Sequence, residues 1–343
     1  MDRKEVAVVI LNWNGKRYLQ EFLPSVIKHS KEYARIVVAD NGSSDGSVDY
    51  LEEYLPDIEI LRFDTNHGYA GGYNRALKMI LAKYYILLNS DIEVNENWIS
   101  PVLKLMESDR KVGACQPKIM QYYSHEVFEY AGAAGGFIDF LGYPFCRGRI
   151  FNALEKDNGQ YDKINNNEVF WASGACMFIR AESFHESGGF DENFFAHMEE
   201  IDLCWRLKLK GEKITCCTDS VVYHVGGGTL PKTNPRKTYL NFRNSLWVLA
   251  KNLPAGKFYK LLPVRIILDQ IAAVKFLIDG NFKDAIAVIK AHFAFVRKLH
   301  TMRKSSKNIK GKKVAGIYLR SIVWDYYVGK KQSFRDLPQD RFV

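Results

Sequence analysis

A carboxylate stands at the tip of an apolar run in this sequence. The stretch YYILLNSDIEV covers residues 84–94, and its apolar part stops at the polar pair Asn89-Ser90, directly before Asp91. Carboxylate oxygens are ligands for Mg²⁺ and Mn²⁺, and a bound divalent cation offsets the negative charge that develops on a departing phosphate. Asp91 is therefore a candidate metal ligand, and its chemistry depends on what the neighbouring elements place beside it.

A second group of acids opens an expected amphipathic helix over residues 199–211. Glu199, Glu200 and Asp202 fall in its first turn, and Gly211 ends it. A carboxylate that takes a proton from a hydroxyl as a new bond forms contributes ~10²–10⁴-fold to a rate. Acids in a first turn also stabilise the helix by ~0.3–1 kcal/mol each, which is the structural alternative.

Strands and helices alternate through the first part of the chain, and this order must position both acidic groups. Short apolar runs typical of buried strands are separated by stretches with helical periodicity. The alternation predicts parallel strands joined by right-handed crossovers, and hence an α/β fold with a mostly parallel central sheet. The expected strands are residues 5–12, 35–40, 58–63 and 84–89, and the expected helices are residues 17–29, 47–55 and 73–81.

Small, polar and acidic residues follow each expected strand. In open α/β sheets ligands bind beyond the carboxyl ends of the strands, so these segments should line a site. Turn formation is the alternative explanation for any one of them. The four segments are Asn12-Trp13-Asn14-Gly15, Asp40-Asn41-Gly42-Ser43, Asn66-His67-Gly68 and Asn89-Ser90-Asp91.

Composition limits the class of protein. The chain is 47% hydrophobic, and its six cysteines show no Cys-x-x-Cys spacing, which favours reduced cytoplasmic thiols. No uncharged apolar run approaches the ~20 residues that span a bilayer. The net charge of +9 is uneven, because residues 231–343 hold 24 Lys and Arg against 6 Asp and no Glu. This basic region is expected to be helical and to face a polyanionic surface.

Several long motifs together resemble the family 2 glycosyltransferases, which have the GT-A fold, and especially their bacterial rhamnosyltransferase-like branch. The similarity covers roughly residues 5–230 and weakens beyond Asn244. It implies a GT-A catalytic domain over residues 1–230, followed by a helical, basic region over residues 231–343. The motifs are VAVVILNWNG, VVADNGSSDGS, NHGYAGGYNRAL, LLNSDIEV, WASGACMFIR, GGFDENFFAHMEEIDLCWRLKLKG and VVYHVGGG.

The resemblance implies a site for a nucleotide-diphosphate sugar. Asp40 is expected to meet the base with Asn12 nearby, although Asp40 could instead form an Asx turn. The glycine-rich motif matches neither the Rossmann nor the P-loop pattern, which argues against NAD and ATP chemistry. Trp171 could stack on a sugar or fill the core. The candidate donor-binding residues are Asn12, Asn14, Asp40, Asn41, Gly68, Gly72, Asn74, Arg75, Asn89, Ser90, Trp171 and Gly174.

The resemblance also implies a divalent metal, Mg²⁺ or Mn²⁺, held by Asp91 and His224. The usual Asp-x-Asp signature of the family has Asn89 at its first position here, so Asp91 needs a second ligand. A structural histidine is the alternative for His224. The expected reaction is a single displacement with inversion, in which Glu200 acts as the general base. Glu200 stands where the family has Asp, which leaves Asp202 and Glu199 as alternatives.

The basic region suggests where the protein acts. Two helical stretches, residues 257–278 and 282–300, are apolar on one face and carry Lys or Arg on the other, and residues 297–313 hold eight basic residues and no acid. We expect peripheral binding to the inner face of the cytoplasmic membrane, a glycan or lipid-linked glycan acceptor, and no nucleic-acid partner. The alternatives are a helical cap on the catalytic domain and a non-catalytic nucleotide-sugar or glycan-binding protein.

Overall fold

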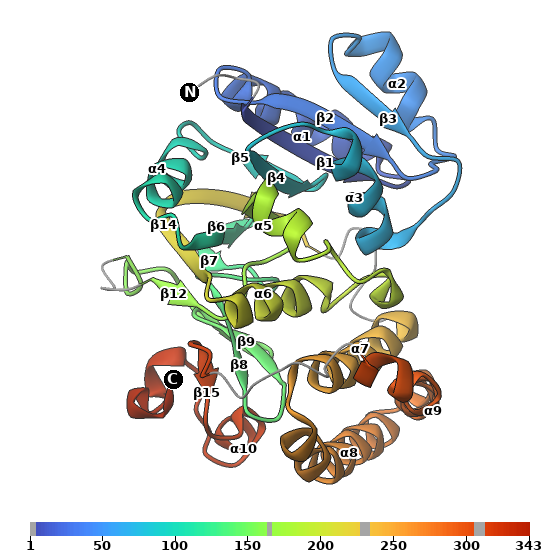
Figure 1. Cartoon of the computed structure of the whole chain (residues 1–343), viewed down its shortest axis with the longest axis vertical. Helices are drawn as coiled ribbons and strands as arrows, with labels where there is room; N and C mark the ends of the chain where they lie inside the picture. The colour runs from blue at the N-terminus through green and yellow to red at the C-terminus, as the bar shows by residue number, and fades with distance from the viewer. Residues whose placement is uncertain (1–4, 163–166, 227–233, 305–312) are drawn as a thin grey trace.

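The computed structural model describes residues 5–162, 167–226, 234–304 and 313–343. A ten-stranded mixed sheet forms its centre, with helices on both faces (Figure 1). The strand order along the main path is β12-β14-β6-β13-β4-β1-β2-β3, while β5 pairs with β14 and β7 pairs with β6. This architecture confirms the predicted α/β class.

The first half of the sheet follows the predicted alternation. Strands β1, β2, β3 and β4 are parallel to one another, and β1 lies between β2 and β4. The residues of β1 are almost all buried, as expected for a parallel strand covered on both faces. The elements of this half are β1 (Val6–Asn12), α1 (Lys16–Ser30), β2 (Arg35–Asp40), α2 (Ser47–Tyr54), β3 (Glu59–Arg62), α3 (Gly68–Met79) and β4 (Tyr84–Asn89).

One predicted boundary in this half is wrong. Helix α3 begins at Gly68, five residues before the predicted start at Tyr73, and it includes Gly71 and Gly72. Glycines weaken a helix by ~1 kcal/mol each, which made this stretch resemble a loop. Tertiary packing overrides that preference, because a Cβ at Gly72 would lie 2.7 Å from the side chain of Leu11 in β1.

The second half of the sheet is mixed in direction. Strand β13 runs antiparallel to both β4 and β6, whereas β6 and β14 are parallel to each other. The elements are β5 (Ile92–Val94), α4 (Ser100–Ser108), β6 (Val112–Gln121), β7 (Ser124–Phe128), β12 (Glu168–Val169), β13 (Cys176–Arg180), α5 (Ala181–Glu186), the 3₁₀ turn η2 (Glu192–Phe194), α6 (Glu199–Lys210) and β14 (Lys213–His224).

A smaller five-stranded sheet lies between the central sheet and the helices at the lower end of the molecule in Figure 1. Strand β15, from the basic region, pairs in parallel with β8, so that region is not purely helical. The strands are β8 (Gly136–Asp139), β9 (Pro144–Cys146), β10 (Arg149–Ile150), β11 (Ala153–Leu154) and β15 (Ile317–Tyr318), and β15 is followed by α10 (Ile322–Tyr327), η3 (Phe334–Asp336) and η4 (Gln339–Arg341).

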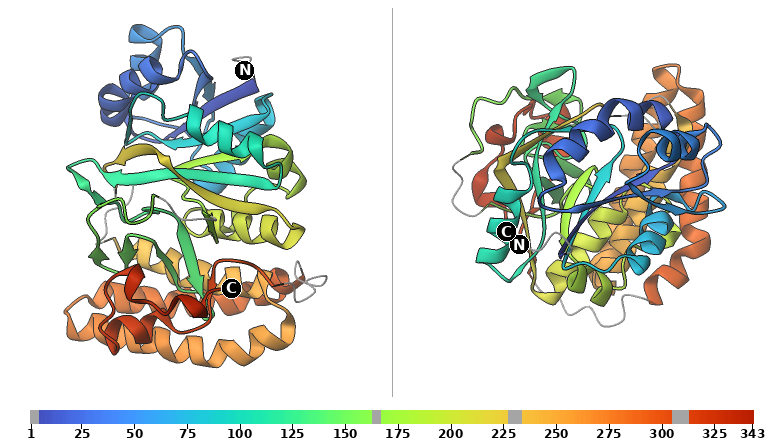
Figure 2. Two further views of the ribbon diagram at one scale, coloured as in Figure 1. Left: turned by 90° about the vertical axis from the view of Figure 1, so that its left-hand side faces the viewer. Right: turned by 90° about the horizontal axis from the view of Figure 1, so that it is seen from above.

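Three long helices form a layer at one end of the molecule, as the left view of Figure 2 shows. They are α7 (Pro235–Asn252), α8 (Ala255–Ile278) and α9 (Phe282–Lys304), and they confirm the helical stretches expected there. Helix α7 begins at Pro235, where the side chain of Asn234 accepts a hydrogen bond from the backbone N–H of Arg236 at 2.9 Å. Helix α7 contacts both α9 and α6, and so connects the layer to the acidic helix.

The core lies on both faces of the central sheet and continues under α7. All six cysteines are buried, and none of them forms a disulfide in the structure. Within the described ranges, no helix is long and apolar enough to cross a membrane.

Candidate active site

The carboxyl ends of β1, β2 and β4 meet at one edge of the sheet. Asn12 of β1 lies opposite Asp40 of β2, and Leu11 lies opposite Asn89 of β4. Asn12 donates from Nδ2 to Oδ1 of Asp40 at 3.0 Å, and Asp40 accepts from the backbone N–H of Ser43 at 3.0 Å. The structure thus brings the predicted pair Asn12 and Asp40 together, and the turn contact of Asp40 is present as well.

Asn12 keeps one polar atom free at this edge. Its Oδ1 is buried and has no hydrogen-bond partner within the described part of the chain. A Cβ at Gly15 would lie 2.4 Å from this oxygen, so only glycine leaves room there. An unsatisfied buried acceptor costs ~1–3 kcal/mol. A ligand with a hydrogen-bond donor, such as the N–H of a nucleotide base, would satisfy it.

Asn14 and Asn41 join the loops around this edge. Oδ1 of Asn14 accepts from the backbone N–H of Ser44 at 2.8 Å. Asn41 accepts from the backbone N–H of His67 at 3.1 Å and donates to the carbonyl of Gly68 at 3.0 Å. These contacts shape the predicted donor site by holding its loops.

The two predicted glycines of α3 allow close contacts between protein segments. Gly68 has a φ of +71°, and a Cβ there would lie 2.5 Å from the carbonyl oxygen of Phe195. Gly72 lies against Leu11 of β1, as described above. Both glycines are therefore explained by packing, and Gly68 brings the start of α3 against the segment that precedes the acidic helix α6.

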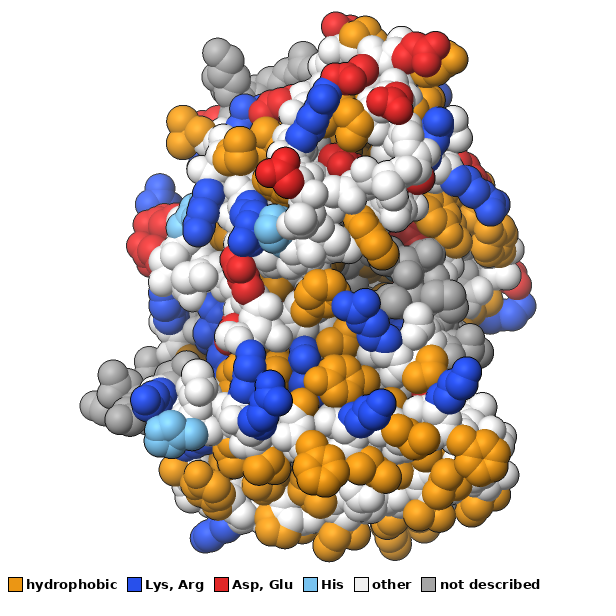
Figure 3. All heavy atoms as spheres, turned by 90° about the vertical axis from the view of Figure 1, so that its right-hand side faces the viewer, with side chains coloured by type: hydrophobic (Ala, Val, Ile, Leu, Met, Phe, Trp, Pro, Cys, Tyr) orange, Lys and Arg blue, Asp and Glu red, His pale blue; other side chains and the backbone are white. Residues whose placement is uncertain are grey.

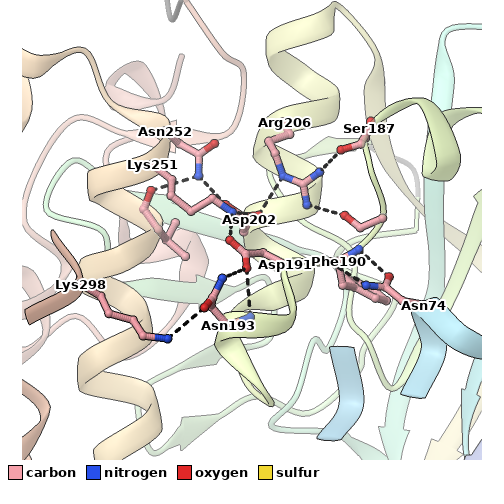
Figure 4. Close-up of polar contacts among 12 residues, drawn as sticks. Asn74, Ser187, Phe190, Asp191, Asn193, Asp202, Arg206, Lys251, Asn252 and Lys298 are labelled. Carbon is pink, nitrogen blue, oxygen red and sulfur yellow. Dashed lines mark hydrogen bonds and ion pairs between the residues drawn. The ribbon is translucent and has the colours of Figure 1, made fainter. Parts of the chain in front are cut away.

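Asn74 and Arg75 hold α3 to the segment before α6. Asn74 donates to the carbonyl of Phe190 at 2.8 Å and accepts from its N–H at 2.9 Å, as Figure 4 shows. Arg75 forms an ion pair with Glu192 at 3.2 Å. The side chains of both predicted donor-site residues are engaged in these contacts.

Asp91 and His224 are brought together, as predicted, because β14 ends beside β5. His224 is paired in register with Ile92, and its Nε2 lies 3.1 Å from Oδ1 of Asp91. On the other side of the ring, Nδ1 lies 3.3 Å from Oε2 of Glu129. Nδ2 of Asn89 is 3.4 Å from Nε2 of His224. The three charged side chains form a buried row, Asp91–His224–Glu129.

Charge and burial act against each other in this row. Burial lowers the pKa of His224, but Asp91 and Glu129 outweigh it and raise the pKa to about 10. Burial raises the pKa of Asp91, but His224 outweighs it and the pKa ends below its usual value. The pKa of Glu129 is lowered for the same reasons. The two carboxylates of the row therefore favour one positive charge at the position of His224, between Asp91 and Glu129.

The row fits a divalent metal. Asp91 offers a carboxylate oxygen, and Nε2 of His224 lies 3.1 Å from it. Glu129 lies where its carboxylate can accept a hydrogen bond from Nδ1–H, which would leave the lone pair on Nε2 for a metal, the arrangement common behind metal-bound histidines. Sequence reasoning missed Glu129, because it lies in the stretch HEVFEYAG, which carries no recognisable motif. Within the described residues no cluster of three metal-ligating side chains surrounds a single point.

Asp202 is committed to ion pairs. It is fully buried in α6 and receives hydrogen bonds from Arg206 at 2.8 Å, Lys251 at 2.9 Å and Asn252 at 2.8 Å (Figure 4). Burial raises the pKa of Asp202, but the charges of Arg206 and Lys251 outweigh it and lower the pKa. A carboxylate so neutralised is a poor base, so this alternative for the general base loses support.

Glu199 and Glu200 are in the opposite situation. Burial raises the pKa of Glu200 to about 7, and burial together with Glu200 raises that of Glu199 well above its usual value. Each has a buried Oε2 without a hydrogen-bond partner among the residues described. A buried carboxylate with a raised pKa and a free oxygen is typical of a proton-transfer group. Both therefore remain candidates for the base.

The segment that leads into α6 has unusual backbone geometry. Phe195, His197 and Met198 have φ values of +66°, +68° and +75°, in the left-handed region that residues with side chains rarely adopt. Such conformations cost about 1–3 kcal/mol each and persist only where surrounding contacts impose them.

Helix α7 imposes this geometry. Asn244 is buried and donates from Nδ2 to three backbone carbonyls, those of residues 194, 196 and 197, at 3.1, 2.9 and 2.7 Å. Its neighbour Arg243 donates to the carbonyl of Phe194 at 3.0 Å. The basic region therefore holds the entrance to the acidic helix. From the sequence, Asn244 had no predicted role of its own and marked only the point beyond which the family resemblance weakens.

The remaining predicted residues lie nearer the core. Trp171 is buried and donates from Nε1 to the carbonyl of Phe137 at 2.9 Å, which favours its alternative as a core residue. The carbonyl of Gly174 accepts from the hydroxyl of Tyr69 at 2.6 Å. Ser90 is half-buried at the edge of the sheet, facing the loop after β1.

Known proteins resemble this chain in sequence. Residues 7–188 match the family described as Glycosyl transferase family 2. N-acetylglucosaminyl-diphospho-decaprenol L-rhamnosyltransferase of Mycobacterium tuberculosis is 26% identical over 219 residues, which cover 60% of this chain and 70% of that protein. Rhamnosyltransferase WbbL of Escherichia coli K12 is 24% identical over 224 residues, covering 61% of this chain and 79% of that protein.

Solved structures share the fold. TarS 1–349 of S. aureus, solved with UDP-GlcNAc, has a TM-score of 0.57 at 14% identity and covers 88% of each chain. Mannosyltransferase PcManGT from Pyrobaculum calidifontis, solved with GDP-Man and Mn²⁺, has a TM-score of 0.52 at 14% identity, over 88% of this chain and 84% of that one. These similarities confirm the predicted GT-A fold. Since the family match spans more than half of the sequence, this glycosyltransferase belongs to glycosyl transferase family 2.

Proposed function

We propose that this protein is an inverting, metal-dependent glycosyltransferase that moves a sugar from a nucleotide-diphosphate donor to a hydroxyl of a glycan or lipid-linked glycan. The observation that carries the proposal is the contact between the edge of the sheet and the segment that leads into α6. Asn41, after β2, donates to the carbonyl of Gly68 at 3.0 Å, and the backbone N–H of Ala70 donates to the carbonyl of Phe195 at 3.2 Å. The loops at the sheet edge and the segment before Glu199 and Glu200 therefore contact the same turn of α3, which supports one shared site.

Each group has a separate task in this proposal. A divalent cation held by Asp91 and His224 would supply positive charge for the departing diphosphate. Glu200 accepts the proton of the acceptor hydroxyl while the hydroxyl oxygen bonds to the anomeric carbon. The bond from that carbon to the diphosphate breaks, and its electron pair leaves with the nucleotide. Attack from the side opposite the leaving group inverts the configuration, and no covalent enzyme intermediate forms.

The direct test is release of nucleotide from a panel of UDP-, dTDP- and GDP-sugars with candidate acceptors. We expect turnover with a member of one nucleotide class, and loss of more than 100-fold in kcat for Glu200→Gln with little change in donor affinity. Equal turnover by Glu200→Gln would contradict the assignment of the base. Donor binding without turnover across the donor and acceptor panels would favour the alternative of a non-catalytic sugar-nucleotide-binding protein. NMR of the product reports the anomeric configuration, which we expect to be opposite to that of the donor.

The proposal includes peripheral binding to an anionic membrane surface. Apolar side chains are exposed on α8 and α9 at helical spacing, where a monomer in water would bury them. Figure 3 shows this apolar surface at the lower end of the molecule, with Lys and Arg side chains above it. This pattern favours an interfacial location over a simple solvated cap. The exposed residues are Val264, Ile267, Ile271, Val274 and Ile278 on α8, and Phe282, Ile286, Ile289, Phe293 and Val296 on α9.

A further inference from the structure

A groove of about 480 Å³ lies between α7 and α9. Its lining combines cations with aromatic rings, and the lining includes no acidic residue. We call it the α7–α9 groove. The side chains that matter for its chemistry are Arg243, Trp247, Lys290, Phe293, Arg297 and Lys298.

The four cations of the α7–α9 groove have no carboxylate partner among the described residues. Arg243 donates to the carbonyl of Phe194, and Lys298 donates to Oδ1 of Asn193 at 3.0 Å, so both are held by neutral acceptors. Lys290 and Arg297 are exposed on α9, about two helical turns apart. Four positive charges without neutralisation around one groove favour a polyanionic ligand over a neutral one.

A buried donor adds a second, independent sign of a ligand. Trp247 lines the groove and is 2% exposed, yet its indole Nε1–H has no hydrogen-bond acceptor in the described chain. The guanidinium of Arg243 lies 4.2 Å from the centre of the Trp247 ring, and Nζ of Lys298 lies 5.8 Å from it. A ligand oxygen in the groove could accept from the indole N–H and pair with these cations.

The position of the groove defines the ligand further. On its inner side, Asn193 and Phe194 contact its cations and belong to the segment that leads to Glu199 and Glu200. On its outer side, Phe293 lines the groove while 75% exposed, in the apolar stripe of α9. The groove therefore lies between the segment that leads into the acidic helix and the surface proposed to face lipid.

We propose that the α7–α9 groove binds the diphosphate of a lipid-linked acceptor. In this arrangement the lipid chain lies along the apolar stripe of α9, and the sugar extends past residues 193–198 toward Glu200. The inference rests on the proposed function and adds the acceptor class and its binding residues. A diphosphate monoester or diester carries two to three negative charges, which matches an unneutralised cluster of cations better than the single charge of most phospholipid headgroups.

The test measures binding of farnesyl diphosphate to the full chain in neutral detergent by calorimetry. We expect binding by the wild type, with affinity reduced at least tenfold, a loss of about 1.4 kcal/mol, by the double substitution Lys290→Gln and Arg297→Gln. These residues are exposed and form no ion pair with the described part of the chain, so the variant should keep its structure. The control substitutes Lys257→Gln and Lys260→Gln on α8, which removes the same charge outside the groove and should leave affinity unchanged.

Three results would overturn the inference. They are equal affinity of the groove variant and the wild type, equal binding of farnesol, and full competition by phosphatidylglycerol in the same detergent at equal concentration. The last result would assign the groove to ordinary anionic lipid. Donor turnover by the wild type separates the two proposals. Turnover without specific farnesyl diphosphate binding contradicts only the groove, whereas specific binding without turnover on any donor contradicts only the catalytic proposal.

Discussion

Nζ of Lys251, on α7, lies 2.9 Å from Oδ2 of Asp202, on α6, and both side chains are buried. Lys251 also pairs with Asp191 at 2.7 Å, just before the left-handed segment. A helix from the basic region thus holds the acidic helix and the segment before it by one ammonium group. Removing one partner of a buried ion pair leaves the other charge uncompensated.

Replacing Lys251 with Met should therefore destabilise the protein by about 3 kcal/mol. Urea unfolding followed by circular dichroism would measure this loss. The matched control is Lys275→Met on α8, where Lys275 pairs with Asp279 at 2.5 Å on the exposed surface. Exposed pairs contribute little, so the control should unfold like the wild type. Equal unfolding midpoints for all three proteins would contradict the importance of the buried pair.

Asn244→Ala should reduce both stability and turnover. The substitution removes hydrogen bonds to three carbonyls that hold the segment before α6, at a cost of about 2–3 kcal/mol. Because this segment positions Glu199 and Glu200, kcat should fall at least tenfold. Asn241→Ala is the control, because Asn241 lies half-buried on the same helix and its side chain forms no hydrogen bond with the described residues. Cleavage between residues 194 and 198 in limited proteolysis should rise for Asn244→Ala only, and an unchanged pattern would argue against this positioning role.

The rate should depend on pH through Glu200. A base must be deprotonated, and burial raises the pKa of Glu200 to about 7. We expect kcat/KM to rise with pH below about 7 and to level off above it, in a profile measured with saturating metal. A profile flat from pH 5 to 8 would indicate another base.

The stability of the folded protein should fall over the pH range in which Glu200 ionises, whereas the rate rises over that range. The folded protein keeps a proton on Glu200 up to a higher pH than the unfolded chain does, so ionisation of Glu200 reduces stability as pH rises from about 4.5 to about 7. Glu200→Gln removes this loss. At pH 8 the variant should be inactive but at least as stable as the wild type, as measured by thermal unfolding. A variant that is less stable than the wild type would mean that the ionised carboxylate has a structural partner.

Metal binding should need the nucleotide. Asp91 and His224 supply few ligands, so Mn²⁺ should bind weakly to the protein alone and much more tightly with UDP or another matching nucleotide diphosphate present. Glu129→Gln should weaken the nucleotide-assisted binding about 10–100-fold, as loss of a partner behind a metal-bound histidine does. Calorimetry with and without nucleotide measures both effects. Tight binding of Mn²⁺ alone that is lost in Asp91→Asn would show a more complete metal site.

Membrane binding should depend on the stripe of α9. The double substitution Ile289→Ser and Phe293→Ser should reduce pelleting with vesicles that contain phosphatidylglycerol. Leu81→Ser is the control. Leu81 is 90% exposed, but it lies in the loop after α3, far from α9 in the sequence. Added salt should weaken wild-type binding, because part of it is electrostatic. Equal pelleting with neutral vesicles, or none with either kind, would contradict electrostatic binding at this surface.

The order of strands in the sequence was enough to predict which residues meet at the edge of the sheet. Asn12, Asp40 and Asp91 all come directly after apolar runs, and parallel strands bring such ends to one edge. The meeting of His224 with Asp91 depended on the family resemblance, because β14 reaches that edge from more than a hundred residues away.

Long-range packing explains what the sequence did not predict. Glu129 contacts the imidazole ring of His224, which lies 95 positions further along the chain, and no local sequence pattern marks Glu129. Asp202 and Glu200 look equivalent in a helical first turn, but Lys251 and Arg206 form ion pairs with Asp202 and not with Glu200. The glycines of α3 looked like a ligand-binding loop, whereas Gly72 allows a helix to approach β1. In each case the deciding partner is remote in sequence.

The pairing of β15 with β8 affects how the helical layer is held against the rest of the protein. Helix α7 is paired with the body through Lys251, and β15, which follows α9 in the sequence, belongs to the second sheet. The chain therefore contacts the body both before and after α8 and α9. If α8 and α9 rest on a bilayer, these contacts would hold Glu199 and Glu200 at one height above the lipid. The distance from the lipid surface to these acids would then be constant. The protein would favour acceptors in which the glycan between the lipid and the terminal hydroxyl has the length that spans this distance.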